Sequence, residues 1–199
     1  TQEIGKKKIF FSDKKIILDA IKLKNSILSN NIKLNIIKEI SGCKKLSSNL
    51  NFKRSIINSK EVRRGDIFFA IKGKKNDGND FVTQSFKNNA SASVVNKIQK
   101  KLNINRQIKV KNTLKFLTLC SKTFRNNINT KIVAITGSCG KTTLKELLGN
   151  SLKKISKVSI SPKSYNNKFG VPLSLFNLKQ NDEFGILEVG MDKKGEIDY

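Results

Sequence analysis

The residues best suited to chemistry form one short segment, Thr136-Gly137-Ser138-Cys139-Gly140-Lys141-Thr142-Thr143. Two glycines let a backbone turn tightly and bring its N–H groups close to phosphate oxygens. A lysine directly after the second glycine can place positive charge on the β- and γ-phosphates of a nucleotide, and the next hydroxyl can bind Mg²⁺. The segment therefore predicts a loop that binds nucleotide phosphates and Mg²⁺, with Lys141 and Thr142 as its principal side chains.

The segments on either side of this loop have the character that such a loop needs. Residues 132–135 are apolar and predict a buried strand, and the residues after Gly140 predict a helix that starts near Lys141. That helix carries a leucine stripe at helical spacing, which predicts a packed face. The stripe consists of Leu144, Leu147, Leu148 and Leu152. A strand, a glycine-containing loop and a helix form the context of a phosphate loop.

The spacing of the loop differs from the usual G-x-x-x-x-G-K-T pattern, because Ile135 stands five residues before Gly140. The bland alternative is an ordinary turn between a strand and a helix that happens to contain glycine and lysine. The sequence Gly-Lys-Thr-Thr between two such elements favours the phosphate-binding interpretation.

A carboxylate for magnesium is expected at the end of a neighbouring strand. Residues 184–189 are mostly apolar and predict a strand, and Glu188 stands near its end. A carboxylate in such a strand is costly unless it serves a cation or another partner. We therefore predict Thr142 and Glu188 as metal ligands, and Lys141 and Glu188 as catalytic residues. The alternative is a glutamate that points to solvent from the strand end.

The composition limits the classes of protein. The chain has 199 residues, with 40 Lys and Arg against 15 Asp and Glu, which gives a net charge of +25. Such charge can indicate a nucleic-acid partner. The lysines are spread along the chain, however, and Asn and Ile are also frequent, so the coding bias of an AT-rich genome accounts for most of the charge.

Several kinds of site and location are disfavoured. The chain has no histidine, so histidine catalysis and histidine metal ligation are excluded within it. Three widely spaced cysteines (Cys43, Cys120 and Cys139) fit neither a disulfide framework nor a zinc site. No apolar run approaches the roughly 20 residues of a membrane helix, and the start of the chain is a poor signal peptide. A cytoplasmic protein without membrane insertion is expected.

The order of the predicted elements suggests three parts. Residues 1–32 predict a helical or poorly ordered extension. Residues 33–111 contain a strand at 66–71, a polar loop at 74–80, a helix bearing Phe81, Val82 and Phe86, and a strand at 92–95, which is a βαβ rhythm. Residues 112–199 begin with a helix at 112–128 that Asn112 caps. Further strands follow at 158–160 and 184–189, with a helix between them that has Pro172 in its first turn.

Three sets of segments together resemble the Mur ligase family, the ATP-dependent amide-forming enzymes of peptidoglycan synthesis. The first set is Asn58-Ser59-Lys60, residues 62–73 and Asp77-Gly78-Asn79-Asp80-Phe81; the second is residues 134–143; the third is Lys145-Glu146, Ser164-Tyr165-Asn166-Asn167 and residues 170–175, 187–190 and 195–197. The third set is typical of the family member that joins D-Ala-D-Ala to UDP-MurNAc-tripeptide. A sister ligase, which adds the third amino acid, shares the first two sets and is the close alternative.

The resemblance implies a fold, an activity and a set of site residues. The fold is α/β, with a small UDP-substrate-binding domain at 33–111 followed by the start of a P-loop, parallel-sheet ATPase domain at 112–199. The activity is phosphorylation of a peptide carboxylate by ATP, followed by attack of the D-Ala-D-Ala amine on the acyl phosphate. The nucleotide residues are Thr136, Gly137, Ser138, Cys139, Gly140, Lys141, Thr142, Thr143, Asn166 and Asn167; the substrate residues are Ser59, Lys60, Gly73, Asp77, Gly78 and Asn79.

Departures from the family pattern affect the substrate contacts more than the ATP loop. The family's Asp-Ser-Arg is Asn58-Ser59-Lys60 here, which weakens any bidentate arginine contact, and its Asp-Gly-His ends in Asn79. Cys139 replaces a common asparagine and is interpreted as a small loop residue, because nothing in the sequence supplies a base to activate it. For Asn166-Asn167, turn chemistry before a helix is the plain alternative.

Two other classes stay open, and the resemblance adds expectations about the chain as a whole. A basic P-loop protein that binds nucleic acid would gather Lys and Arg on one face with aromatic residues between them, whereas this chain has no Trp and two Tyr. A nucleotide-binding module without catalysis is the other class. The family's later elements lie beyond Tyr199, so the chain is expected to be a fragment without turnover. The protein is also expected to be a monomer that binds no nucleic acid.

Overall fold

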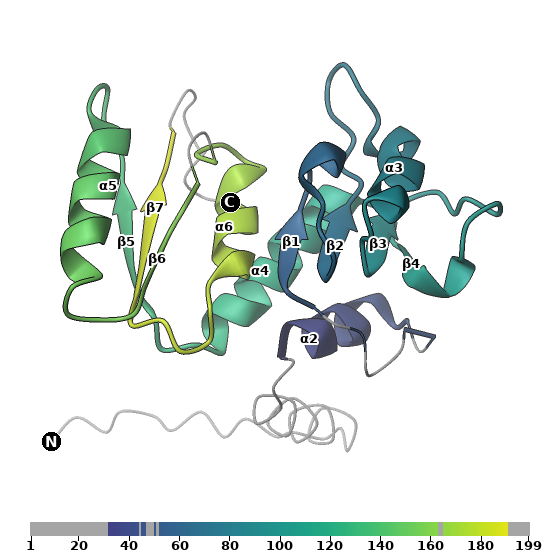
Figure 1. Cartoon of the computed structure of the whole chain (residues 1–199), viewed down its shortest axis with the longest axis horizontal. Helices are drawn as coiled ribbons and strands as arrows, with labels where there is room; N and C mark the ends of the chain where they lie inside the picture. Colours follow the sequence, from purple (N-terminus) through teal and green to yellow (C-terminus); the bar gives the residue numbers. More distant parts are fainter. Residues whose placement is uncertain (1–31, 44, 47–49, 51, 163–164, 191–199) are drawn as a thin grey trace, which may run out of the picture. The chain divides into compact units, whose positions relative to one another are not determined.

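The computed structural model describes residues 32–43, 45, 46, 50, 52–162 and 165–190 (Figure 1). The described residues after Ile32 belong to one compact unit. Apart from Ile32, the N-terminal extension expected at 1–32 lies outside the described residues, and so do Ser164 and residues 195–197. Within the described part of the chain, no helix combines the length and apolar character needed to cross a bilayer.

The first sheet has four parallel strands in the spatial order β1-β2-β3-β4. The strands are β1 (Arg54–Ile56), β2 (Asp66–Phe69), β3 (Ala92–Val95) and β4 (Gln107–Lys109). The helical segments of this region are α2 (Ile32–Ser41), α3 (Val82–Lys87) and the 3₁₀ helices η1 (Ser59–Glu61), η2 (Gly78–Phe81) and η3 (Ile104–Arg106). Every residue of β2 and β3 is buried, as expected for interior strands of a parallel sheet.

The strands predicted at 66–71 and 92–95 are confirmed, with one change of boundary. The first strand ends at Phe69, because the Ile71 N–H donates back to the Phe69 carbonyl and starts a turn. The helix predicted after the polar loop begins at Val82. The sequence assigned Phe81 to this helix, but Phe81 precedes α3 and is 38% exposed.

The second sheet has three parallel strands in the order β5-β7-β6. They are β5 (Lys131–Ile135), β6 (Val158–Ile160) and β7 (Phe184–Glu188). Helices α5 (Lys141–Leu152) and α6 (Gly170–Asn177) lie on opposite sides of this sheet (Figure 1). Right-handed connections that run in opposite directions across a sheet produce this placement. The predicted α/β class with a parallel sheet behind the loop is confirmed.

Two packing predictions around the loop are wrong. Strand β5 is not buried along its length: Ile135 is buried and Ala134 is exposed, because β5 is an outer strand of the described sheet and β7 is the central one. The leucine stripe is not the packed face of α5 either. Leu144 and Leu147 are 55% and 63% exposed, and the buried residues of α5 are Lys145 and Gly149.

The packed face of α5 follows from close contact with the sheet. A Cβ at Gly149 would lie 2.3 Å from Cδ1 of Ile160, so the absence of a side chain lets α5 approach β6. Small residues permit this approach and bulky leucines do not. Leucine spacing alone therefore marked the wrong side of the helix.

Helix α4 (Thr113–Asn126) confirms the helix predicted at 112–128. The Asn112 side chain accepts a hydrogen bond from the Lys115 N–H at 2.9 Å, so the predicted N-cap is also confirmed. The buried face of α4 contributes Phe116 and Phe124 to an aromatic cluster that β2 and α6 complete. The ring pairs are Phe69–Phe116, Phe69–Phe176 and Phe124–Phe176, with centroids 5.9 to 6.4 Å apart.

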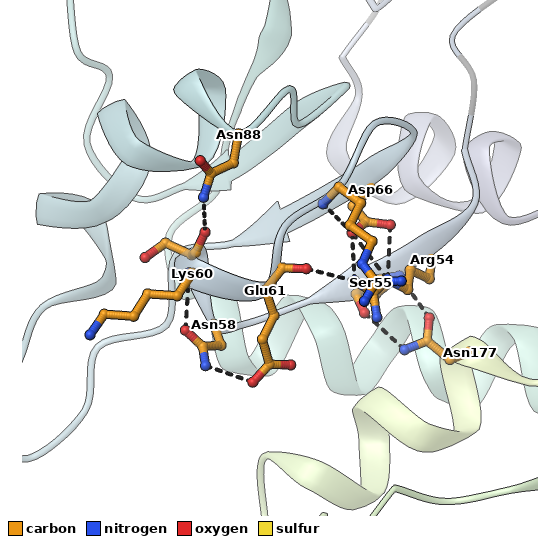
Figure 2. A network of polar contacts seen from close by, with 10 residues as sticks. Arg54, Ser55, Asn58, Lys60, Glu61, Asp66, Asn88 and Asn177 are labelled. Carbon is orange, nitrogen blue, oxygen red and sulfur yellow. Dashed lines mark hydrogen bonds and ion pairs between the residues drawn. The ribbon is translucent and has the colours of Figure 1, made fainter.

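A polar network at β1 supports this arrangement (Figure 2). The Arg54 Nε donates to both carboxylate oxygens of Asp66 at 3.0 Å, and Asp66 is 1% exposed. The side chain of Asn177, at the end of α6, accepts from the Ser55 N–H at 2.7 Å and donates to the Ser55 carbonyl at 2.8 Å. One asparagine thus satisfies both backbone groups on the outer edge of β1 and ties that edge to the helix that covers the second sheet.

Candidate phosphate and metal site

The predicted phosphate loop connects β5 to α5 and has an exposed backbone turn. Gly137 and Gly140 have φ angles of 143° and 75°, a region in which L side chains are strained, so both positions favour glycine. Helix α5 begins at Lys141, directly after Gly140, as predicted. The first amides of α5 therefore adjoin the loop, where the helix dipole favours an anion.

The lysine of the loop lies against the loop's own backbone. Lys141 Nζ donates to the Gly137 carbonyl at 2.5 Å and approaches the Ser138 carbonyl at 3.4 Å. A phosphate that bound here would replace these contacts with a charged partner. The remaining predicted loop residues, Thr136, Ser138, Cys139 and Thr143, are exposed.

Glu188 lies at the end of β7 and is 4% exposed, so the alternative of a solvent-facing glutamate is wrong. Its Oε2 accepts a hydrogen bond from Thr142 Oγ1 at 2.8 Å, and its Oε1 accepts one from Asn166 Nδ2 at 2.9 Å. The β5–β7 register pairs Ile135 with Glu188, which sets the carboxylate beside the start of the loop. The fold therefore brings together the two residues predicted as metal ligands.

The electrostatics of Glu188 favour its ionised form. Burial acts to raise the pKa of this carboxyl group. The hydrogen bonds from Thr142 and Asn166 and the nearby ammonium groups of Lys145 and Lys141 outweigh burial and hold the pKa below its ordinary value. The site therefore presents an anionic oxygen beside a hydroxyl oxygen at neutral pH.

The donor set fits a cation that also takes ligands from a nucleotide. Among the described residues, no group of three or more His, Cys, Asp or Glu side chains gathers to hold a metal. Thr142 and Glu188 supply hard oxygen donors, which Mg²⁺ prefers. Mg²⁺ is usually held by one or two protein oxygens together with substrate phosphates.

The two asparagines after Tyr165 have different roles in the structure. Asn166 contacts Glu188 through its side chain, and its carbonyl accepts from the Gly190 N–H at 2.6 Å. Asn167 Oδ1 accepts from the Phe169 and Gly170 N–H groups, both at 3.0 Å, at the start of α6. The contacts of Asn167 are therefore those of a turn residue before a helix, which was the alternative interpretation of this pair. Asn166 instead contacts Glu188 and lies in the site.

Lys145 is a site residue that the sequence analysis missed. The sequence marked Lys145-Glu146 only as part of a family resemblance. Its ammonium is buried and lies 3.7 Å from Glu188 Oε2. The available signal was its position one helical turn after Lys141, because residues four apart share a helix face.

The residues predicted to bind the UDP substrate lie in the loops that follow β1 and β2. Ser59 is 6% exposed, and its Oγ donates to Gln84 Oε1 at 2.8 Å. Lys60 and Gly73 are exposed. Within the described residues, no hydrogen bond or ion pair joins any of these three to Glu188, so they form a separate group.

The second of these loops is braced internally. Asp77 Oδ1 accepts from the backbone N–H and side-chain amide of Asn79, and these hydrogen bonds lower the pKa of Asp77. A Cβ at Gly78 would lie 2.5 Å from the backbone of Ala70 and Ile71, so only glycine fits there. Asp77, Gly78 and Asn79 therefore fix the shape of the loop whose exposed part includes Gly73.

Comparison with known proteins shows which class of protein this chain resembles. Residues 135–199, which begin at the phosphate loop and include Glu188, match the Mur ligase middle domain. The resemblance predicted from the sequence is confirmed by this match together with the relatives below.

Within that class the likeness is to MurF. The UDP-N-acetylmuramoyl-tripeptide–D-alanyl-D-alanine ligase of Buchnera aphidicola is 35% identical over a 147-residue alignment that covers 72% of this chain and 31% of that protein. MurF from Acinetobacter baumannii superposes with a TM-score of 0.71 at 30% identity, over 83% of this chain and 36% of its own. MurF from Thermotoga maritima, solved in complex with ADP, superposes with a TM-score of 0.60 at 36% identity, over 76% of this chain and 35% of its own. The chain spans about a third of the length of these relatives.

Proposed function

We propose that this chain carries the ATP-binding loop and the UDP-substrate-binding region of a ligase that joins D-Ala-D-Ala to UDP-MurNAc-tripeptide. In this reaction ATP would phosphorylate the terminal carboxylate of the tripeptide, and the amine of D-Ala-D-Ala would displace phosphate from the acyl phosphate. The observation that carries the proposal is the hydrogen-bonded pair Thr142–Glu188 beside the Gly137–Gly140 turn. The identities of the two substrates are taken from the names of the similar ligases.

At the nucleotide, the chain's own residues bind and orient charge. The loop amides from Thr136 to Thr143 and the start of α5 would hold the phosphates. Lys141 would leave the carbonyls of Gly137 and Ser138 and place its ammonium on the β- and γ-phosphates. Asn166 would keep Glu188 in its present orientation.

Thr142 and Glu188 are the residues that would hold Mg²⁺. When bound, the metal would neutralise charge on the transferred phosphoryl group. The contribution of the protein is an ionised carboxylate and a hydroxyl that already face each other at 2.8 Å. Catalysis of this kind depends mainly on positioning and charge neutralisation.

The UDP end of the substrate would bind at the loops after β1 and β2, outside the carboxyl ends of parallel strands, where ligands of open α/β sheets bind. Lys60 and Gly73 are exposed there and would contact the ligand. Ser59, Asp77, Gly78 and Asn79 would hold the loops in shape. The division into a substrate domain at 33–111 and an ATP domain at 112–199, in a monomeric cytoplasmic protein, belongs to this proposal.

Equilibrium binding tests the proposal on the chain as it is. Titration calorimetry with ATP and Mg²⁺ should show saturable binding, and Lys141→Met should weaken it by at least about tenfold, because a charge-assisted phosphate contact is lost. Lys131→Met, at the far end of β5, is the matched control and should bind as the parent does. A second titration with UDP-MurNAc-tripeptide should also show binding. A folded chain that binds neither ligand would overturn the proposal.

A further inference from the structure

Lys145 is a buried lysine that the proposed chemistry does not use. Its side chain is 0% exposed, among the largest fully buried side chains of the described residues. An ammonium group in a protein interior is costly unless charged and polar partners surround it. A lysine on the packed face of α5 therefore needs partners whose interactions offset the free-energy cost of burying its charge.

The partners of Lys145 come from three elements. Its Nζ donates to the carbonyl of Ser161, just after β6, at 2.8 Å. It lies 3.7 Å from Glu188 Oε2 at the end of β7, and 3.6 Å from Glu146 Oε1 on its own helix. The side chain of Glu146 is 40% exposed, whereas that of Glu188 is 5% exposed. The buried ammonium and the buried carboxylate are thus the pair that solvent screens least.

The hydrogen-bond partners of Glu188 carry no charge, so its negative charge must be balanced by a lysine. Thr142 and Asn166, which donate hydrogen bonds to the carboxylate oxygens, are neutral. Lys141 directs its ammonium to carbonyl groups of the loop. Among the described residues, Lys145 is the one cation within ion-pair distance of Glu188.

We propose that Lys145 is a positioning residue of this site: its ammonium is the internal counter-cation of Glu188 and opposes the uptake of a divalent cation that arrives without a nucleotide. A divalent cation that arrives without nucleotide would be repelled by the Lys145 ammonium, which is already paired with the carboxylate of Glu188. A dication bound to ATP brings phosphate charge that offsets this repulsion. The inference rests on the proposed function, because it assigns Thr142 and Glu188 to Mg²⁺.

A double-mutant cycle tests the charge pairing without nucleotide or metal. Lys145→Gln keeps a donor near Ser161 but removes the charge, and Glu188→Gln removes the carboxylate. Urea unfolding in EDTA should show that Lys145→Gln loses at least half of its destabilising effect once Glu188→Gln is present. Lys145→Met repeats the cycle with an apolar chain. If either variant folds only with Gln at position 188, the pairing is supported. Equal losses in both backgrounds, or unfolding in both, would overturn it.

Calorimetry with Mg²⁺ alone then tests the opposition to free metal. Lys145→Gln should bind Mg²⁺ at least about threefold more tightly than the parent, because like-charge repulsion is removed. Lys145→Arg retains the charge and should stay within about twofold of the parent. Glu183→Gln, an exposed carboxylate just before β7, is the control. Unchanged or weaker Mg²⁺ binding by Lys145→Gln would overturn the inference.

The two proposals can fail separately. Coupling between Lys145 and Glu188 in a chain that binds no ATP would refute the proposed function and leave the charge pairing standing. ATP binding that Lys141→Met abolishes, together with an additive cycle, would leave the function standing and refute the role of Lys145.

Discussion

At the scale of single residues, Glu188 determines what this site can do. Its carboxylate is buried, accepts two side-chain hydrogen bonds and lies beside a buried ammonium. Burial alone would favour the neutral acid, and the surrounding donors and cations reverse that preference. The result is a negative charge held in a fixed direction next to the phosphate loop.

The lowered pKa of Glu188 predicts how stability depends on pH. The ionised group stabilises the folded state fully above its ordinary pKa of 4.5, and this contribution is lost as the pH falls through the lower pKa of the folded protein. The stability difference between the parent and Glu188→Gln should therefore shrink as the pH is lowered from 6 to 3. Urea unfolding across this range measures it, with Glu183→Gln as the control for loss of one carboxylate. A difference that stays constant or grows toward pH 3 would contradict the assignment.

Residue types and spacing singled out Lys141, Thr142 and Glu188 as candidates, because each belongs to a local pattern with a known chemical use, and the structure places Thr142 and Glu188 in contact. Lys145 could not be predicted in the same way. A lysine in a helix is ordinarily solvated, and only the packing of α5 on β6 and β7 places this one beside Glu188. Asn166 and Asn167 are adjacent and chemically identical, so only the course of the backbone separates a site residue from a helix cap.

At the scale of elements, the start of α6 is packed against the turn that carries Asn166. A Cβ at Gly170 would lie 2.3 Å from the Tyr165 Cα and 2.4 Å from its carbonyl carbon. These are backbone atoms, so no side-chain rotation can relieve the contact. The position of this helix and the position of Asn166 are therefore coupled.

Gly170→Ala should consequently damage both stability and the site. We expect a loss of about 1–3 kcal/mol from overpacking, with weaker ATP binding because the turn that holds Asn166 must shift. Urea unfolding and ATP titration measure the two effects. Lys168→Ala, which shortens an exposed side chain two residues earlier, should change neither by more than about 0.5 kcal/mol. If Gly170→Ala were as stable as the parent, the predicted overpacking against the Tyr165 backbone would be wrong.

The elements that the sequence predicted were those with a strong local signal. Helix α4 has a cap and a periodic apolar face, and β2, β3 and β7 are mostly apolar segments of four or five residues. Strands β1 and β4 have three residues each, of which one is apolar, so they were missed, whereas the equally short β6 has two apolar residues and was predicted. The packed face of α5 was assigned incorrectly because leucine spacing reports amphipathicity, whereas the contact at Gly149 depends on the absence of a side chain.

At the scale of the whole molecule, the two sheets are connected by an aromatic cluster and by one amide. Phe69 of the first sheet, Phe124 of α4 and Phe176 of α6 meet through edge contacts. Asn177 follows Phe176 and bonds both backbone groups of Ser55 (Figure 2). Long-range contacts of this kind leave no trace in local sequence patterns.

Asn177→Ala should lower the stability of the whole unit. Ser55 is 0% exposed, so its N–H and carbonyl would lose their partner in a place that water reaches poorly. We expect a loss of about 2–4 kcal/mol, from two unsatisfied buried groups. Asn177→Asp retains the acceptor and should lose less. Chemical denaturation measures both variants, and a loss below about 0.5 kcal/mol for Asn177→Ala would contradict the bridging role.

ATP binding by the loop between β5 and α5 can be tested directly through Cys139. Cys139 is exposed within that loop, whereas Cys120 is buried and its burial raises its pKa far above the usual range. In a Cys43→Ser background, the rate of Cys139 alkylation should fall at least about tenfold when saturating ATP and Mg²⁺ are added, because bound phosphates cover the turn. Lys141→Met should abolish this protection. An alkylation rate that ATP leaves unchanged in the folded chain would contradict ATP binding at this loop.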